Sequence, residues 1–276
     1  MKKGLLILLA ISLLCFGALV VFQPYLIKAI YAKYKSTEHF VALKHDSRVR
    51  YEPGAEANAR KLAQVLDDVA LEVEEALGAK FDRNIEAYIC ATQEQFNEYV
   101  YLSKNARGAV YWEKLFLSPG AFQGSYLRPI TLHELTHYLF ITHLSDKQHI
   151  QNIPLWFREG IAVYVANGNS EYMTRSRYIR LMTNAEKSDF WAGKYDAWFS
   201  TADPSSVLAA SGAINFELYR IYGYLVHYLA MQDEGKFKSF IGNLLDGQEF
   251  YSALNEMYGK DLAELLTDFS IYLKNT

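Results

Sequence analysis

The stretch Thr131-Leu-His-Glu-Leu-Thr-His137 decides the fold, because it carries the pattern His-Glu-x-x-His. In a helix, His133 and His137 lie four residues apart on one face, so both imidazoles can reach one small cation. Glu134 lies about 100° further around the axis, where its carboxylate can take a proton from an attacking water without binding the metal. Three leucines recur at helical spacing and would hold this helix in a core: Leu132, Leu135 and Leu139.

A second stretch, Ile153 to Ala162 (IPLWFREGIA), strengthens this interpretation. The five-residue pattern alone arises by chance in roughly one such chain in a hundred, and two histidines on one helix face can also be buried core residues. Pro154 suits the first turn of a new helix, and Glu159 follows His137 by twenty-two positions. Two histidines and one glutamate form an established ligand set for catalytic zinc, with a fourth position open to water.

Both motifs together resemble the gluzincin metallopeptidases, and most closely their small bacterial branch called peptidase MA-like. The resemblance covers residues 38 to 273 and extends over Pro154-x-Trp156-x-x-Glu159-Gly160-x-Ala162. It implies a zincin-like fold, Zn²⁺ as cofactor and a peptide or protein as substrate. It also implies His133, His137 and Glu159 as zinc ligands and Glu134 as general base.

Gluzincins place an edge strand beside the zinc helix, where it pairs with extended substrate backbone. The comparable residues here are Gly108, Ala109, Val110 and Tyr111, which the resemblance assigns to substrate binding. In the related aminopeptidases this strand carries Gly-x-Met-Glu-Asn, whose glutamate helps to hold a free N-terminus. Because Tyr111 takes the glutamate's place, we expect an endopeptidase rather than an aminopeptidase, although Glu113 could substitute.

The segment Tyr219 to Leu229 (YRIYGYLVHYL) has a helical pattern and resembles the aminopeptidase sequence Tyr-x-x-Gly-x-Leu-Leu-Leu-His-x-Leu. The resemblance aligns Tyr219 with the tyrosine that stabilises the oxyanion of the transition state. Tyr222 and Tyr224 compete for this role, since the glycine is displaced by one position. Alternatively, all three tyrosines pack in a core. His227 is expected to be a core residue or to lie behind the site.

The N-terminus reads as an uncleaved signal anchor. Lys2 and Lys3 precede an apolar run from Leu5 to Phe22, which is near the minimum length for crossing a bilayer. No small-x-small cleavage site follows it. A buried core helix is the alternative. Lysines lie on both sides of the run, so the positive-inside rule is nearly balanced. We expect a single-pass membrane protein with its catalytic domain outside the cytoplasm.

The remaining chain predicts an α+β fold. Strands are expected at 39–43, 85–90, 107–112 and 114–117, and helices at 55–77, 92–102 and 219–229, with two or three more after Gly235. Residues 1–37 would form the anchor and a stalk. Residues 38–276 would form the peptidase domain, with an α+β lobe carrying the zinc helix (38–145) and a mainly helical lobe (146–276). The net charge of −3 gives no reason to expect nucleic-acid binding.

Several details bear on the alternatives. Cys90 has no partner at metal-ligand spacing and reads as a small buried residue. His143 and His149 fall in a polar stretch, 143–152, that reads as a solvated loop. Val163 stands where thermolysin-like chains carry an aspartate that orients a zinc-bound histidine. Two other functions remain open: a catalytically silent envelope protein that keeps the fold for binding or scaffolding, and a zinc ion with a purely structural role.

Overall fold

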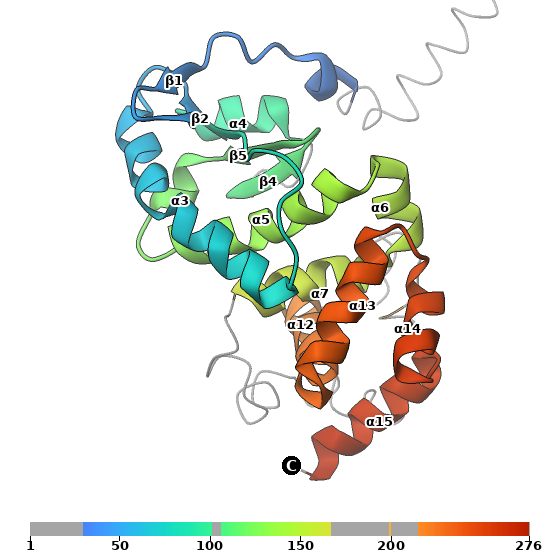
Figure 1. Cartoon of the computed structure of the whole chain (residues 1–276). Coiled ribbons are helices and arrows are strands. Elements are labelled where there is room, and N and C mark those ends of the chain that lie inside the picture. Colours follow the sequence, from blue (N-terminus) through green and yellow to red (C-terminus); the bar gives the residue numbers. More distant parts are fainter. Residues whose placement is uncertain (1–29, 101–105, 167–198, 200–214, 276) are drawn as a thin grey trace, which may run out of the picture. The chain divides into compact units, whose positions relative to one another are not determined.

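The structure is a computed structural model that describes residues 30–100, 106–166, 199 and 215–275 (Figure 1). The chain divides into two compact units. The first comprises Met1–Lys61 with Glu86–Gln123, and the second comprises Leu62–Ile85 with Gly124–Thr276. The first unit contains the sheet and the second is helical, so the expected mixed α+β fold is confirmed.

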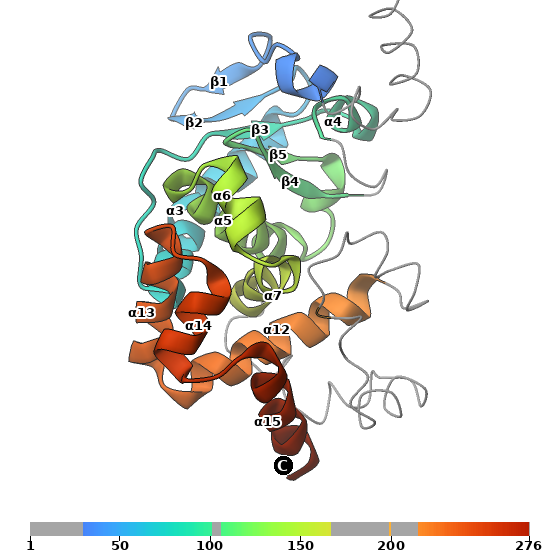
Figure 2. The ribbon, with the colours of Figure 1, turned by 90° about the vertical axis from the view of Figure 1, so that its right-hand side faces the viewer.

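The first unit is built on a five-stranded mixed sheet (Figure 2). Its strands are β1 (Val41–Leu43), β2 (Asp46–Tyr51), β3 (Ala87–Ile89), β4 (Gly108–Tyr111) and β5 (Lys114–Leu117), in the order β1-β2-β3-β5-β4. The three central strands are parallel, whereas β1 and β4 pair antiparallel with their neighbours. Strand β4 therefore lies at the edge of the sheet, as the sequence predicts. Strand β2 was not expected.

A tight turn connects β4 to β5. Trp112 and Glu113 have φ angles of 52° and 60°, and Tyr111 pairs with Lys114 directly across the turn. Two successive residues in the left-handed region are the mark of a type I′ hairpin, whose twist matches that of the strands. Glycine or asparagine usually occupies such positions, so this turn is strained and is held by the strands on either side.

Helix α4 (Gln93–Tyr99) covers an aromatic core of the first unit. The hydroxyl of Thr92 accepts a hydrogen bond from the Gln95 N–H at 3.2 Å, which confirms the predicted helix start. Cys90 is fully buried in the same core, and burial raises the pKa of its thiol. Eight buried residues form this core: Phe40, Tyr88, Cys90, Phe96, Tyr99, Val100, Ala109 and Phe116.

The second unit consists of helices (Figure 1). They are α5 (Leu127–His143), α6 (Asp146–Asn152), α7 (Leu155–Ala166), α12 (Asn215–Gln232), α13 (Glu234–Leu245), α14 (Phe250–Tyr258) and α15 (Leu262–Asn275), together with α3 (Glu56–Leu77) from Leu62 onward. The predicted helix at 55–77 is confirmed as α3, its apolar stripe is buried, and Gly78 ends it with a φ of 67°. The stripe of α15 is buried as well, at Leu265, Leu266, Phe269 and Leu273.

Aromatic side chains anchor helix α7. The ring of Trp156 lies 5.2 Å from that of Phe250 on α14 and 5.6 Å from that of Phe199. The ring of Phe157 lies 5.6 Å from that of Phe240 on α13. Trp156 and Phe157 are both almost fully buried, so α7 is held firmly by α13 and α14.

The stretch 143–152 is not the solvated loop expected from its polarity. After α5 ends at His143, residues Asp146–Asn152 form α6, which starts with a capping box between Ser145 and Gln148. His143 is exposed and donates a ring N–H to the carbonyl of Lys80 at 2.7 Å. The expectation for His149 is wrong: it is only 7% exposed, and its ring lies 6.2 Å from that of Phe140.

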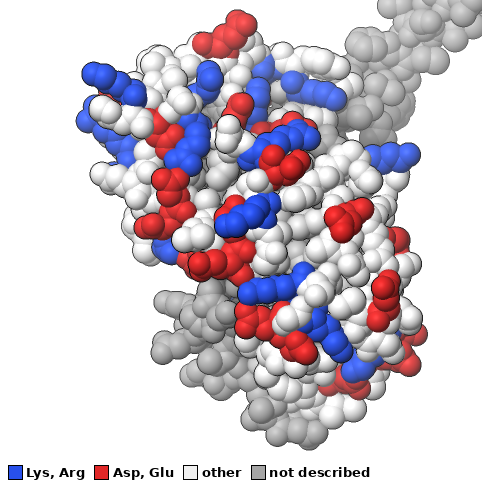
Figure 3. All heavy atoms as spheres, viewed as in Figure 1, with Lys and Arg blue, Asp and Glu red and all other residues white. Residues whose placement is uncertain are grey.

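Surface charges of both signs are interspersed on the face shown in Figure 3. Some form pairs one helical turn apart, such as Arg60 with Glu56 and Lys238 with Glu234. Among the described residues no helix combines the length and the apolar character needed to cross a membrane. The apolar run expected to form an anchor belongs to residues 1–29, which lie outside the described part, as does most of the aromatic-rich region 171–203.

Candidate metal centre

Helix α5 carries the His-Glu-x-x-His motif on a well-packed framework. Leu132, Leu135 and Leu139 are buried as predicted. Two buried threonines are satisfied within the helix: Thr131 donates its hydroxyl hydrogen to the Leu127 carbonyl at 2.7 Å, and Thr136 donates to the Leu132 carbonyl at 2.8 Å. Both threonines of the motif helix are therefore buried without an unsatisfied hydroxyl group.

The two histidines of α5 point to one place. Their Nε2 atoms lie 3.3 Å apart, and their rings are nearly perpendicular, at 80°. Two neutral imidazoles can make this contact only if one nitrogen donates and the other accepts. A cation held between both nitrogens accounts for the same convergence and uses both lone pairs.

Glu159 reaches the same place from α7. Its Oε2 atom lies 3.6 Å from the Nε2 of His133 and 3.7 Å from the Nε2 of His137. Helix α7 starts directly after Pro154, whose carbonyl accepts the N–H groups of Phe157 and Arg158 at 3.0 and 3.1 Å. Glu159 is 18% exposed, so the carboxylate is sheltered but can still be approached.

The three separations fit a zinc ion. Tetrahedral zinc with bonds of about 2.0–2.1 Å places its ligand atoms about 3.3–3.4 Å from one another. The observed triangle of 3.3, 3.6 and 3.7 Å is close to one face of such a tetrahedron. Within the described residues, these three are the only group of three or more histidine, cysteine or acidic side chains that converge in this way. The expected ligand set His133, His137 and Glu159 is thus brought together.

The electrostatics of the group favour an ionised carboxylate. Burial would raise the pKa of Glu159, but the imidazoles of His137 and His133 hold it well below its usual value. Burial would lower the pKa of His133, yet the nearby carboxylates of Glu159 and Glu134 raise it. A negative carboxylate facing two imidazoles is a suitable environment for a divalent cation.

Helix α12 packs against α7 at very short distance. A Cβ atom at Gly160 would lie 2.7 Å from the carbonyl oxygen of Tyr222, so only glycine fits there. Because glycine has no side chain, Gly160 beside Glu159 permits this close approach. The approach brings Tyr219, one turn before Tyr222, into electrostatic range of Glu159 and Glu134.

The three tyrosines considered for the oxyanion differ in their surroundings. Tyr224 is buried, and its ring lies 5.7 Å from Phe269 of α15. Tyr222 is buried 5.5 Å from the ring of Phe199, and burial together with the charge of Glu159 raises its pKa to about 12. Tyr219 is partly exposed, and burial and then Glu159 raise its pKa as well. The phenols of Tyr219 and Tyr222 therefore keep their protons at neutral pH.

The predicted substrate strand and the predicted base belong to different units. Gly108, Ala109, Val110 and Tyr111 form β4, which belongs to the first unit, so their contact with substrate stays a prediction. Glu134 is on α5 next to His133 and is partly exposed. Helix α5 belongs to the same compact unit as α7.

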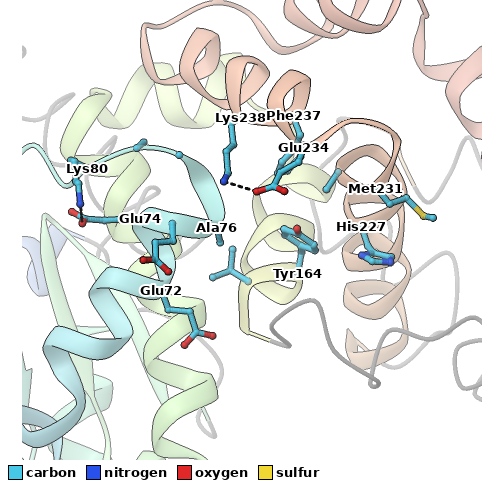
Figure 4. Close-up of a pocket in the computed structure, with 15 residues that line it drawn as sticks. Glu72, Glu74, Ala76, Lys80, Tyr164, His227, Met231, Glu234, Phe237 and Lys238 are labelled. Atoms are coloured by element: carbon cyan, nitrogen blue, oxygen red, sulfur yellow. Dashed lines mark hydrogen bonds and ion pairs between the residues drawn. The ribbon is translucent and has the colours of Figure 1, made fainter.

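A separate cavity of about 950 Å³ lies between the end of α3 and helices α7, α12 and α13 (Figure 4). Tyr164 and His227 line it, together with Glu72, Glu74, Glu75 and Glu234. Three of these carboxylates are already paired, Glu72 with Arg128, Glu74 with Lys80 and Glu234 with Lys238. His227 lines this cavity and is not one of the three residues of the metal group, and burial lowers its pKa. No residue of the metal group lines this cavity.

Comparisons with known proteins identify the family. Neither a curated protein nor a solved structure matches the chain. A family model described as the Peptidase MA superfamily matches residues 66–275, which include α5, α7 and α12. Members of this superfamily are usually zinc metallopeptidases, in agreement with the group formed by His133, His137 and Glu159. The chain belongs to the Peptidase MA superfamily.

Proposed function

We propose that this protein is a zinc metallopeptidase that hydrolyses peptide bonds in a peptide or protein substrate. The observation that carries the proposal is the convergence of three ligand atoms, from two helices, at separations of 3.3 to 3.7 Å. His133, His137 and Glu159 would hold the ion. Bound there, zinc would polarise the scissile carbonyl and make a water molecule more acidic.

The chain's own residues supply the proton transfers. Glu134 follows His133 on the motif helix and is partly exposed, so its carboxylate can accept the proton of the attacking water and pass it to the leaving amine. Tyr219 keeps its phenolic proton and can donate a hydrogen bond to the oxygen that gains negative charge. Each role is one that peptide hydrolysis requires.

The intact set of residues argues against the two other functions. A silent scaffolding protein has no need of a general base, yet Glu134 is present beside the three ligands. A structural zinc site is usually closed by four protein ligands. Among the described residues, only three side chains join the group, which leaves one position for water.

We further propose that the enzyme is an endopeptidase held at a membrane. Tyr111 replaces the glutamate that fixes a free N-terminus in the related aminopeptidases. The apolar run from Leu5 to Phe22 would form a single-pass anchor with the catalytic domain outside the cytoplasm. Cleavage of N-terminally acetylated peptides at internal bonds would support endopeptidase action, whereas activity confined to free N-termini would refute it. Protease accessibility of the body in intact cells tests the orientation.

The central experiment compares wild type with Glu134→Gln on a broad peptide library, with cleaved bonds identified by mass spectrometry. We expect wild type to cleave defined bonds, and Glu134→Gln to keep its zinc while losing cleavage by at least about 10²-fold. Glu94→Gln, which changes an exposed carboxylate on α4, should cleave like wild type. Absence of cleavage by zinc-loaded wild type would favour the scaffolding function.

A further inference from the structure

Arg158 has an unusual position for a positively charged side chain. It directly precedes Glu159 on α7, and its Nε atom is buried without a hydrogen-bond partner. The residue as a whole is only partly exposed. Within the described part of the chain, it forms no salt bridge, although other arginines such as Arg48, Arg60 and Arg128 do.

A sheltered guanidinium that has no partner among the described residues is unfavourable in the free protein. Arginine is rarely buried unless it is paired, because removing its charge from water is costly. Burial accordingly lowers the pKa of Arg158, with Glu159 and then Tyr219 opposing that shift. The group nevertheless stays protonated at neutral pH, as arginine does in proteins. A partner of opposite charge would therefore bind here with a strong preference.

The neighbouring side chains that the structure describes do not supply that partner. The carboxylate of Glu159 faces His133 and His137, at 3.6 and 3.7 Å, and is committed to the metal group. His149 contributes no charge at neutral pH, because burial and then Arg158 lower its pKa to about 3. Among the described residues, Arg158 is thus a cation without a salt-bridge partner, next to the ligand Glu159 on α7.

We propose that Arg158 binds a carboxylate of the substrate, so that the site selects peptides with a negative charge beside the scissile bond. This inference rests on the proposed function, since it names the substrate class of the same site. The planar guanidinium matches a carboxylate with two parallel hydrogen bonds, which a lysine cannot make. The carboxylate has two sources, the C-terminus of a short peptide or an aspartate or glutamate side chain.

Binding of short peptides to full-length, zinc-loaded Glu134→Gln protein tests this directly. The probes form two pairs: acetyl-Ala-Leu-Ala as free acid and as amide, and acetyl-Ala-Asp-Ala-amide with acetyl-Ala-Asn-Ala-amide. We expect an acidic probe to bind about 10- to 100-fold more tightly than its neutral partner. Preference within the first pair assigns the C-terminus, and preference within the second assigns the side chain.

The preference should disappear when Arg158→Gln is added. It should persist with Arg220→Gln, which removes an exposed arginine from α12. Arg158→Lys keeps the positive charge but cannot form two parallel hydrogen bonds, so it should retain only a small preference for the acidic probes. Equal binding of both members in each pair, or a preference that survives Arg158→Gln, would overturn the proposal.

Zinc affinity and thermal stability separate recognition from a structural role. If Arg158 binds substrate, Arg158→Gln should leave the zinc affinity and the thermal stability close to those of the protein with Arg158. If the variant loses zinc or fails to fold, while Arg158→Lys folds without any preference for the acidic probes, Arg158 is structural and the inference fails. Selective binding without cleavage by wild type would refute the proposed function alone, whereas cleavage without selectivity would refute the role of Arg158 alone.

Discussion

The backbone of Gly160 on α7 lies directly against the carbonyl of Tyr222 on α12, so that a Cβ atom at Gly160 would come within 2.7 Å of that oxygen. This approach joins the helix that carries Glu159 to the helix that carries Tyr219. A single glycine thereby controls how a metal ligand and the proposed oxyanion donor are placed relative to each other.

Gly160→Ala should destabilise the protein by about 1–3 kcal/mol, because the added methyl group has no room and the two helices must separate. Thermal or urea unfolding measures the effect. Gly242→Ala is the matched control, since Gly242 lies in α13 with open space around it and a helical alanine is favoured there. Equal effects of the two substitutions would show that α7 and α12 do not pack as described.

Tyr219→Phe should lower kcat by about 10²-fold or more with little change in KM, because the phenol acts only on charge that develops in the transition state. Steady-state kinetics on a cleaved library peptide measures it. Tyr224→Phe is the control, since its ring packs against Phe269 and Tyr272. If Tyr222→Phe, rather than Tyr219→Phe, lowers kcat, the oxyanion role belongs to Tyr222.

Buried His149 should make the metal-free protein sensitive to acid. Its pKa is about 3 in the folded state, mainly because of burial, and about 6.5 in the unfolded state. The unfolded chain therefore binds the extra proton as the pH falls below 6.5, and stability decreases until about pH 3. Between pH 7 and pH 5 this amounts to about 2 kcal/mol.

Urea unfolding at both pH values measures this loss, and His149→Gln should remove most of it. His143→Gln, which changes an exposed histidine, should leave the pH dependence as in wild type. The burial of His149 would be disproved if His149→Gln and wild type lost the same stability between pH 7 and pH 5.

Periodicity and spacing predict most helices, and together with the resemblance to gluzincins they predict the metal group. The apolar stripe of α3 and the four-residue spacing of His133 and His137 are local features, and a helix turns them directly into one face. Glu159 could be predicted as the third ligand because Pro154 indicates the start of a second helix, and Glu159 lies on that helix. The resemblance to gluzincins, which place an edge strand before the zinc helix, also predicts that β4 lies at the edge of the sheet.

Features that depend on tertiary packing were missed. Strand β2 alternates poorly, and within it only Val49 is fully buried, so its pairing with β1 and β3 could not be read from the residues. Helix α6 is polar, yet Ser145 and Gln148 form a capping box that signals a helix start. The burial of His149 and of the Arg158 Nε atom depends on what packs around these side chains, which no local pattern records.

Zinc should stabilise the folded protein by mass action. At a free zinc concentration one hundred times the Kd, the gain is about 2.7 kcal/mol. A thermal-shift titration should therefore raise the Tm of wild type and, to the same extent, that of Glu134→Gln. A Tm that stays constant over this range would mean that zinc does not bind the folded state.

Zinc stoichiometry of the full-length protein is the most direct test of the metal centre. Titration calorimetry supported by native mass spectrometry should find one zinc ion per chain in wild type and in Glu134→Gln. The affinity should fall by at least about 100-fold in His133→Gln and in Glu159→Gln, because each removes one of three ligands. Folded wild type that binds no zinc, or Glu159→Gln that binds it as tightly as wild type, would contradict a site formed by these three side chains.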